Sequence, residues 1–229
     1  GEPLLIKQYF AIWEKILAVN KKCTIHIQTN GSYLPPAFLR MLESSQFEIG
    51  VSLDAPDKST FESIRLNSNF DEVQSNIKTL LEYKKIGKIF MNFNFCPLVA
   101  NWKVLPAMVD YANNADVALK IVNVETPRHL ALQYRSERFL RDVHTYLLNA
   151  HIHTKKNLSI QTQRNVETFK NYLLTIESYI KRSQDRYCDM DVILVNNRTG
   201  LFELLYGLMK TNLLFNAFSV ADKEYMYNE

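Results

Sequence analysis

The sequence predicts an α/β fold built on parallel strands, because short β-rich runs alternate with helical patterns over about the first 125 residues. Runs rich in β-branched and aromatic residues indicate four strands. These runs are 24–29, 47–53, 89–95 and 118–124. The apolar residues between the runs recur every three or four positions, which is typical of helices with one buried face.

The helical spacing recurs before the first strand and after the second and third strands. It is carried by Ile6, Phe10, Trp13, Ile16 and Leu17, by Phe70, Val73, Ile77, Leu80 and Leu81, and by Val104, Met108, Val109 and Ala112. Pro35 and Pro36 indicate the start of another helix, where the missing proline N–H is not needed.

Strands joined in this way through helices run parallel, with right-handed crossovers. An open doubly wound sheet and a partial barrel both satisfy the order, and both gather chemistry at the carboxyl ends of the strands. Beyond about residue 130 long helical stretches follow, near 135–150 and 164–183, with a short strand expected at 191–195 and a helix at 200–214. We therefore expect a core over 1–130, and over 131–229 the last helix of that core followed by a mainly helical extension.

Composition and charge bear on several classes of function. The net charge is +3 and no basic block exceeds two residues, so there is no specific nucleic-acid signal. No apolar run approaches the roughly 18 residues of a membrane span. The scattered Cys23, Cys96 and Cys188 favour a reducing, cytoplasmic setting. His151 and His153 are more typical of a polar loop than of a metal site, so no metal ligand is assigned.

The residues at the strand ends form an ordered series. The chain opens with Gly-Glu-Pro-Leu-Leu, the first strand ends in Thr-Asn-Gly at 29–31, and the second ends in Ser-Leu-Asp at 52–54. Arg65 follows, and the third strand leads from Cys96 to Asn101. In this order the series resembles the radical S-adenosylmethionine (SAM) superfamily, particularly its peptide-modifying and sulfatase-maturing branch, over about residues 1–125.

The resemblance implies a partial (β/α)6-type parallel barrel that lacks its first strand, followed by the helical extension. It also implies SAM as cofactor, a [4Fe–4S] cluster and an external electron donor. Reductive cleavage of SAM would give a 5′-deoxyadenosyl radical, which takes a hydrogen atom from a substrate. A peptide, an RNA and a small molecule all remain open as that substrate.

At the start of the chain, the resemblance implies that Gly1 and Glu2 contact the ammonium group of SAM. Glycine lets a ligand approach the backbone closely. The alternative for Glu2 is to cap the helix that begins at Pro3, where an acid is favoured. Gly31 is expected to adopt the positive φ of a tight turn after Asn30.

Ser52 and Asp54 are two residues apart along a strand, so their side chains point to the same face. The resemblance implies that they contact the ribose of SAM. The alternative is that Asp54 N-caps a helix after Pro56.

Arg65 is a candidate clamp for the SAM carboxylate, since a guanidinium can bind it through two parallel hydrogen bonds. The alternative is a surface pair with Glu62, three residues earlier on a helix. Asn94 shares a face of its strand with Asn92, and either could bind adenine or fix the backbone.

The cluster needs three thiolates from a Cys-x3-Cys-x2-Cys loop. In the family that loop precedes the Gly-Glu-Pro segment, so the ligands are expected upstream of Gly1. The spacing of the three cysteines in this sequence does not provide them, and no catalytic residue is assigned. Two rival functions stay open: a degenerate, non-catalytic binding module and an unrelated α/β-barrel enzyme.

Overall fold

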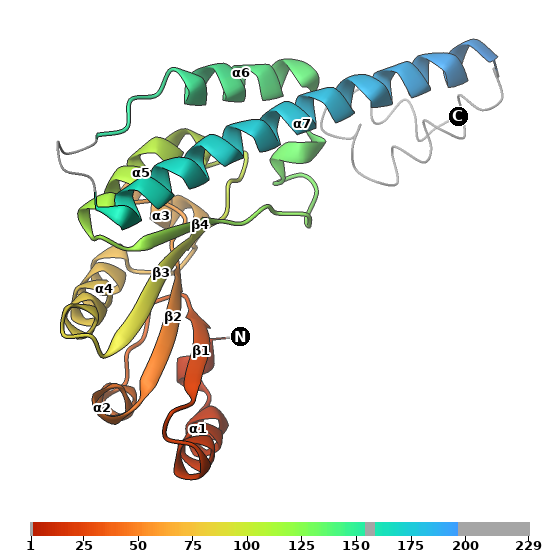
Figure 1. Cartoon of the computed structure of the whole chain (residues 1–229). Coiled ribbons are helices and arrows are strands. Elements are labelled where there is room, and N and C mark those ends of the chain that lie inside the picture. The colour runs from red at the N-terminus through yellow and green to blue at the C-terminus, as the bar shows by residue number, and fades with distance from the viewer. Residues whose placement is uncertain (1, 154–158, 197–229) are drawn as a thin grey trace.

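The computed structural model describes the backbone of residues 2–153 and 159–196, and side chains as far as residue 184 (Figure 1). Gly1 and the helix expected at 200–214 lie outside the described residues. Four strands form one parallel sheet: β1 Thr24–Thr29, β2 Gln46–Ser52, β3 Ile89–Phe95 and β4 Ala118–Ile121. The α/β class with parallel strands is confirmed.

The strands lie in chain order, β1-β2-β3-β4. A doubly wound sheet reverses its strand order at a switch point, and the described strands contain no such reversal. Sequential parallel strands with right-handed crossovers place their connecting helices on one face, as in a barrel. The described sheet is therefore consistent with a partial parallel barrel.

The helices of the first half are α1 Lys7–Val19, α2 Pro36–Ser44, α3 Lys58–Ile64, α4 Phe70–Lys85 and α5 Leu105–Asn114. Short 3-10 turns are η1 Pro3–Leu5, η2 Trp102–Val104 and η3 Leu132–Tyr134. The extension contains α6 Glu137–Leu148 and α7 Ile160–Asn196. The short strand predicted at 191–195 was wrong, because α7 continues through these residues. Short apolar runs do not distinguish a strand from a buried helical segment.

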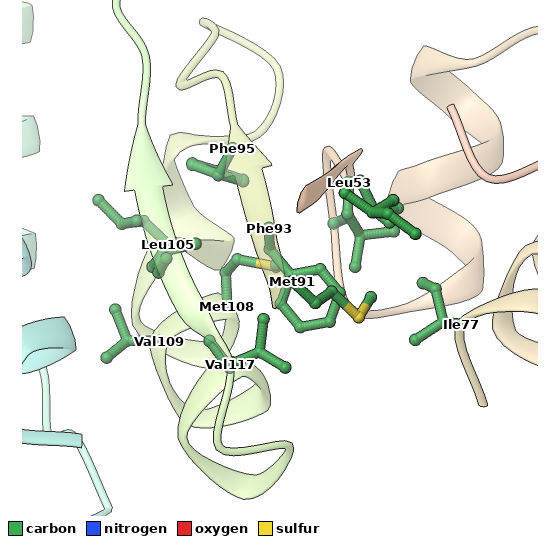
Figure 2. Close-up of a cluster of buried hydrophobic side chains, with 14 of the residues drawn as sticks. Leu53, Ile77, Met91, Phe93, Phe95, Leu105, Met108, Val109 and Val117 are labelled. Carbon is green, nitrogen blue, oxygen red and sulfur yellow. The ribbon is translucent and has the colours of Figure 1, made fainter. Parts of the chain in front are cut away.

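One face of the sheet is apolar and packs against helices. Its fully buried residues include Phe47, Ile49, Val51, Phe93 and Phe95. Figure 2 shows Phe93 and Met91 of β3 among Ile77 from α4 and Leu105, Met108 and Val109 from α5. Trp13 of α1 makes edge and tilted ring contacts with Phe47 and Phe38. This packing fixes the sheet, and with it the positions of the strand ends.

The extension packs on the β4 side of the sheet. Leu140, Val143 and Leu147 of α6 and Phe169, Tyr172 and Ile176 of α7 join the same hydrophobic cluster. Asn165 of α7 also bonds to the backbone beside β4: its Oδ1 accepts from Leu119 N–H at 2.9 Å and its Nδ2 donates to the Val117 carbonyl at 2.9 Å. The boundary near residue 130 remains a prediction.

Candidate cofactor site at the strand ends

The second face of the sheet is polar. It is formed by His26 and Gln28 of β1, Glu48, Gly50 and Ser52 of β2, Asn92 and Asn94 of β3, and Lys120 of β4. These residues alternate with the buried apolar ones, as the period of a strand requires. We call this surface the polar face.

Side-chain hydrogen bonds run both between and within strands on the polar face. Gln28 Nε2 of β1 donates to Ser52 Oγ of β2 at 3.1 Å, and within β3 Asn92 Nδ2 donates to Asn94 Oδ1 at 2.9 Å. Ser52 and Asn94 are register partners, so their side chains lie side by side. A Cβ atom at Gly50 would lie only 2.6 Å from Asn94 Nδ2, so glycine makes room for this amide. The structure places Asn94 on the polar face, and its contact with adenine remains a prediction.

Charged side chains also lie on the polar face. Glu48 Oε2 lies 3.1 Å from His26 Nδ1, its register partner on β1, and Glu48 Oε1 lies 3.5 Å from Lys120 Nζ. Lys120 is the register partner of Asn94, so the Glu48–Lys120 pair runs diagonally along the face toward the carboxyl ends of the strands.

Glu2 fastens the chain start to the end of β1. Its Oε1 accepts hydrogen bonds from Thr29 Oγ1 at 2.7 Å and from Leu4 N–H at 3.3 Å, and its Oε2 accepts one from Asn30 N–H at 2.8 Å. The alternative role of Glu2 as a helix cap is thus confirmed, since it N-caps η1. A carboxylate has about four acceptor positions, so one remains on Oε2 for an ammonium group. Contact with SAM remains a prediction for Glu2, and Gly1 lies outside the described residues.

Gly31 follows at φ +73°, which confirms the tight turn expected after Asn30. Its carbonyl accepts a hydrogen bond from Asn76 Nδ2 of α4 at 2.9 Å. The turn at the end of β1 is therefore held from both Glu2 and α4.

Asp54 and Arg65 form an ion pair beyond the end of β2. Arg65 Nε donates to Asp54 Oδ2 at 2.6 Å, and the side chains are only 23% and 10% exposed, respectively. Both alternatives for these residues were wrong. Asp57, not Asp54, N-caps α3 by accepting from Thr60 N–H. Arg65 does not pair with Glu62, because α3 ends at Ile64 and Arg65 is its C-cap.

The pair keeps hydrogen-bonding capacity for a ligand. Among the described residues, Asp54 Oδ1 and the two Nη groups of Arg65 have no hydrogen-bond partner. A hydroxyl could therefore donate to Oδ1, and a carboxylate could accept from the Nη groups. The structure brings Ser52, Asp54, Arg65 and Asn94 to adjoining strand ends, as predicted, although ligand contact by each stays a prediction.

Cys96 adds a thiol that the interpretation of the sequence did not assign to the site. It follows β3 directly and is partly buried. Burial raises the pKa of the Cys96 thiol above its usual value, and the charge of Asp54 raises it further, while Arg65 opposes the shift. Cys96 therefore lies within electrostatic reach of the pair and stays protonated at neutral pH.

The open acceptors of Glu2 and Asp54 and the open donors of Arg65 are chemically suited to the polar groups of SAM, whereas ligands for the cluster are not found among the described residues. The part of the chain that the structure describes contains no group of three or more His, Cys, Asp or Glu side chains able to hold a metal. In the 151–153 connection, His153 forms a contact with an acidic side chain: its Nδ1 lies 2.7 Å from Asp110 Oδ2 of α5. Within the described ranges, these histidines are not part of any such metal-binding group. None of the described helices is long and apolar enough to cross a membrane.

Comparison with known proteins gives a partial match. No family model matches the chain. It is 29% identical over 122 residues to a protein named "Probable GTP 3′,8-cyclase" from Methanococcus maripaludis strain C6, and 27% identical over 122 residues to its counterpart in strain C5. Each match covers 53% of this chain and 40% of the relative, so the chain matches less than half the length of these relatives.

GTP 3′,8-cyclases are radical SAM enzymes, so the matches support the superfamily. They leave the resemblance to the peptide-modifying and sulfatase-maturing branch a prediction. Over about half of its length, 53%, the chain is similar to radical SAM enzymes of the GTP 3′,8-cyclase kind.

Proposed function

We propose that this chain supplies the SAM-binding part of a radical SAM enzyme. The observation that carries the proposal is the Asp54–Arg65 pair at the carboxyl end of β2, beside Ser52 and Asn94 on the polar face. Parallel α/β folds place ligands at this end of their strands. The similarity to two GTP 3′,8-cyclases supports the same superfamily independently.

Each polar group of SAM has a chemically suitable partner. The remaining acceptor position of Glu2 suits the ammonium, and the Nη groups of Arg65 suit the carboxylate. Asp54 Oδ1 and Ser52 suit the ribose diol, and the Asn94 amide suits adenine. Because Arg65 Nε holds the other oxygen of Asp54, the two residues act as one preorganised unit rather than as two independent contacts.

In the whole protein we propose that reductive cleavage of SAM yields a 5′-deoxyadenosyl radical that abstracts hydrogen from the substrate. The [4Fe–4S] cluster that supplies the electron would be held by a Cys-x3-Cys-x2-Cys loop upstream of Gly1, and reduced by an external donor. The described residues hold and orient SAM, and we assign them no part in electron transfer.

The substrate to test first is a purine nucleotide, because the relatives are named for a reaction of GTP. A peptide and an RNA are the other substrate classes. We place the reaction in the cytoplasm, where the free thiols Cys23 and Cys96 stay reduced.

SAM binding tests the proposal on the 229-residue chain itself. Isothermal titration should detect binding of SAM, and Asp54→Asn should weaken it by about 10- to 100-fold, since a hydrogen bond to a charged group contributes about 1.5–3 kcal/mol. Asp142→Asn, which removes an exposed carboxylate on α6, is the matched control and should bind as wild type does. Absence of binding, or equal loss in both variants, would contradict the proposal.

The complete gene product separates the rival functions. After anaerobic reconstitution with iron and sulfide, a reductant and SAM should give 5′-deoxyadenosine. A non-catalytic binding module would bind SAM without forming this product. An unrelated barrel enzyme would do neither.

A further inference from the structure

Asn101 is a fully buried polar residue beside the candidate site, at 0% exposure. Its Nδ2 donates to the Asp54 carbonyl at 2.9 Å and to the Cys96 carbonyl at 3.1 Å. Its Oδ1 accepts from Leu98 N–H at 2.6 Å. One amide side chain therefore joins the loop after β2 to the loop after β3, with both its donor hydrogens used.

The two carbonyls need this partner because regular sheet pairing stops just before them. The last backbone bond between the two segments runs from Leu53 N–H to the Asn94 carbonyl, at 3.0 Å. Beyond it neither Asp54 nor Cys96 lies in a strand. A buried carbonyl without a donor is strongly disfavoured, so the Asn101 amide takes the place of the next sheet bonds.

We propose that Asn101 is a positioning residue for SAM binding, acting through Asp54. This inference rests on the function proposed above. By fixing the Asp54 backbone, Asn101 sets where the Asp54 carboxylate lies, and the carboxylate in turn holds Arg65 through Nε. The side chain has no exposed surface, so it acts on a ligand through Asp54 rather than by contact. Groups that bind ligands keep their geometry only when such supporting residues hold them.

Asn165 provides a matched control within the same chain. It is also buried, at 1% exposure, and its amide bonds to the backbone at Leu119 and Val117 and to Asn113 Oδ1. Replacing it removes the same kind of buried amide, but at the junction of β4 and α7. A merely structural effect of losing a buried asparagine should therefore appear in both variants.

The test compares Asn101→Ser with Asn165→Ser in the 229-residue chain, using two readouts. The first is the NMR signal of Arg65 Nε–H, which reports its bond to Asp54 without any ligand. We expect Asn101→Ser to move this signal toward that of a free arginine and to speed its exchange with water, while Asn165→Ser leaves it unchanged. If Asn101→Ser does not fold, Asn101→Gln, which keeps the amide but displaces it, is measured instead.

The second readout is SAM affinity. Mutation of residues that hold metal ligands in place typically lowers metal affinity by about 10- to 100-fold. By analogy, we expect SAM affinity to fall about tenfold in Asn101→Ser and to stay unchanged in Asn165→Ser. Equal effects of the two variants on the Arg65 signal, or no effect of Asn101→Ser on either readout, would overturn the proposal. So would a shifted Arg65 signal with unchanged SAM affinity. If the wild type binds no SAM while the Arg65 signal still responds to Asn101 alone, the proposed function fails and the positioning of the pair stands.

Discussion

The two faces of the sheet differ most clearly along β3, where two phenylalanines three residues apart have opposite surroundings. Phe93 lies on the apolar face and is fully buried, whereas Phe90 lies on the polar face and is 64% exposed. The position of a residue along β3, and not its hydrophobicity alone, therefore determines whether it is buried. The apolar face packs against helices, whereas the polar face leaves amide, hydroxyl and charged groups available to bind a ligand.

The largest loss of stability is expected from removing a large side chain from the apolar face. Phe93→Ala should lower the free energy of unfolding by about 3–5 kcal/mol, because it leaves a cavity among packed side chains of α4 and α5. Phe90→Ala is the control on the same strand and should change it by no more than about 0.5 kcal/mol. Urea unfolding measures both. Similar losses for the two variants would mean that the polar face is packed as well.

An intermediate loss of stability is expected from a substitution at Gly50, on the polar face. Gly50→Ala would place a Cβ 2.6 Å from Asn94 Nδ2 and 3.3 Å from Asn92 Nδ2, so we expect a loss of about 1–3 kcal/mol from overpacking. The side-chain amide signals of both asparagines should shift in NMR spectra. Gly87→Ala, whose Cβ would meet nothing within 4 Å, should leave these signals in place. Unmoved asparagine signals in Gly50→Ala would show that the amides do not lie against Gly50.

The smallest loss of stability is expected from a substitution at Asp57, which lies on neither face of the sheet. Burial alone would raise the pKa of Asp57, but hydrogen bonds from Thr60 N–H and the Ser59 hydroxyl hold it below its usual value of 3.8. The ionised cap therefore stabilises the fold fully above pH 3.8, and this contribution is lost as the pH falls through the lowered folded-state pKa. Asp57→Ala should cost about 1 kcal/mol at neutral pH.

Urea unfolding of wild type and Asp57→Ala at a series of pH values checks this expectation. The difference between the two proteins should shrink as the solution becomes acidic. A difference that is constant with pH would show that the Asp57 carboxylate does not cap α3.

Much of the fold could be predicted because its pattern is local. The expected strand at 24–29 matches β1 residue for residue, since Ile25 and Ile27 are buried while His26 and Gln28 alternate with them. The strand expected at 191–195 failed because a short apolar run fits either kind of element.

The composition of the site could be predicted, but its pairing could not. Asp54 and Arg65 were identified separately, each with a local alternative that the structure contradicts. Their mutual bond depends on where α3 ends and how the chain turns back. The bond from Asn101 to Asp54 joins residues 47 positions apart, which no local pattern encodes.

The central claim is that the polar face and its strand ends bind SAM, and NMR mapping of a SAM titration tests it most directly. The account predicts that signals of Ser52, Asp54, Arg65 and Asn94 shift together as SAM is added, while those of Ile49 and Phe93 on the apolar face stay in place. Shifts confined to other surfaces, or none at SAM concentrations that saturate the protein in calorimetry, would contradict it.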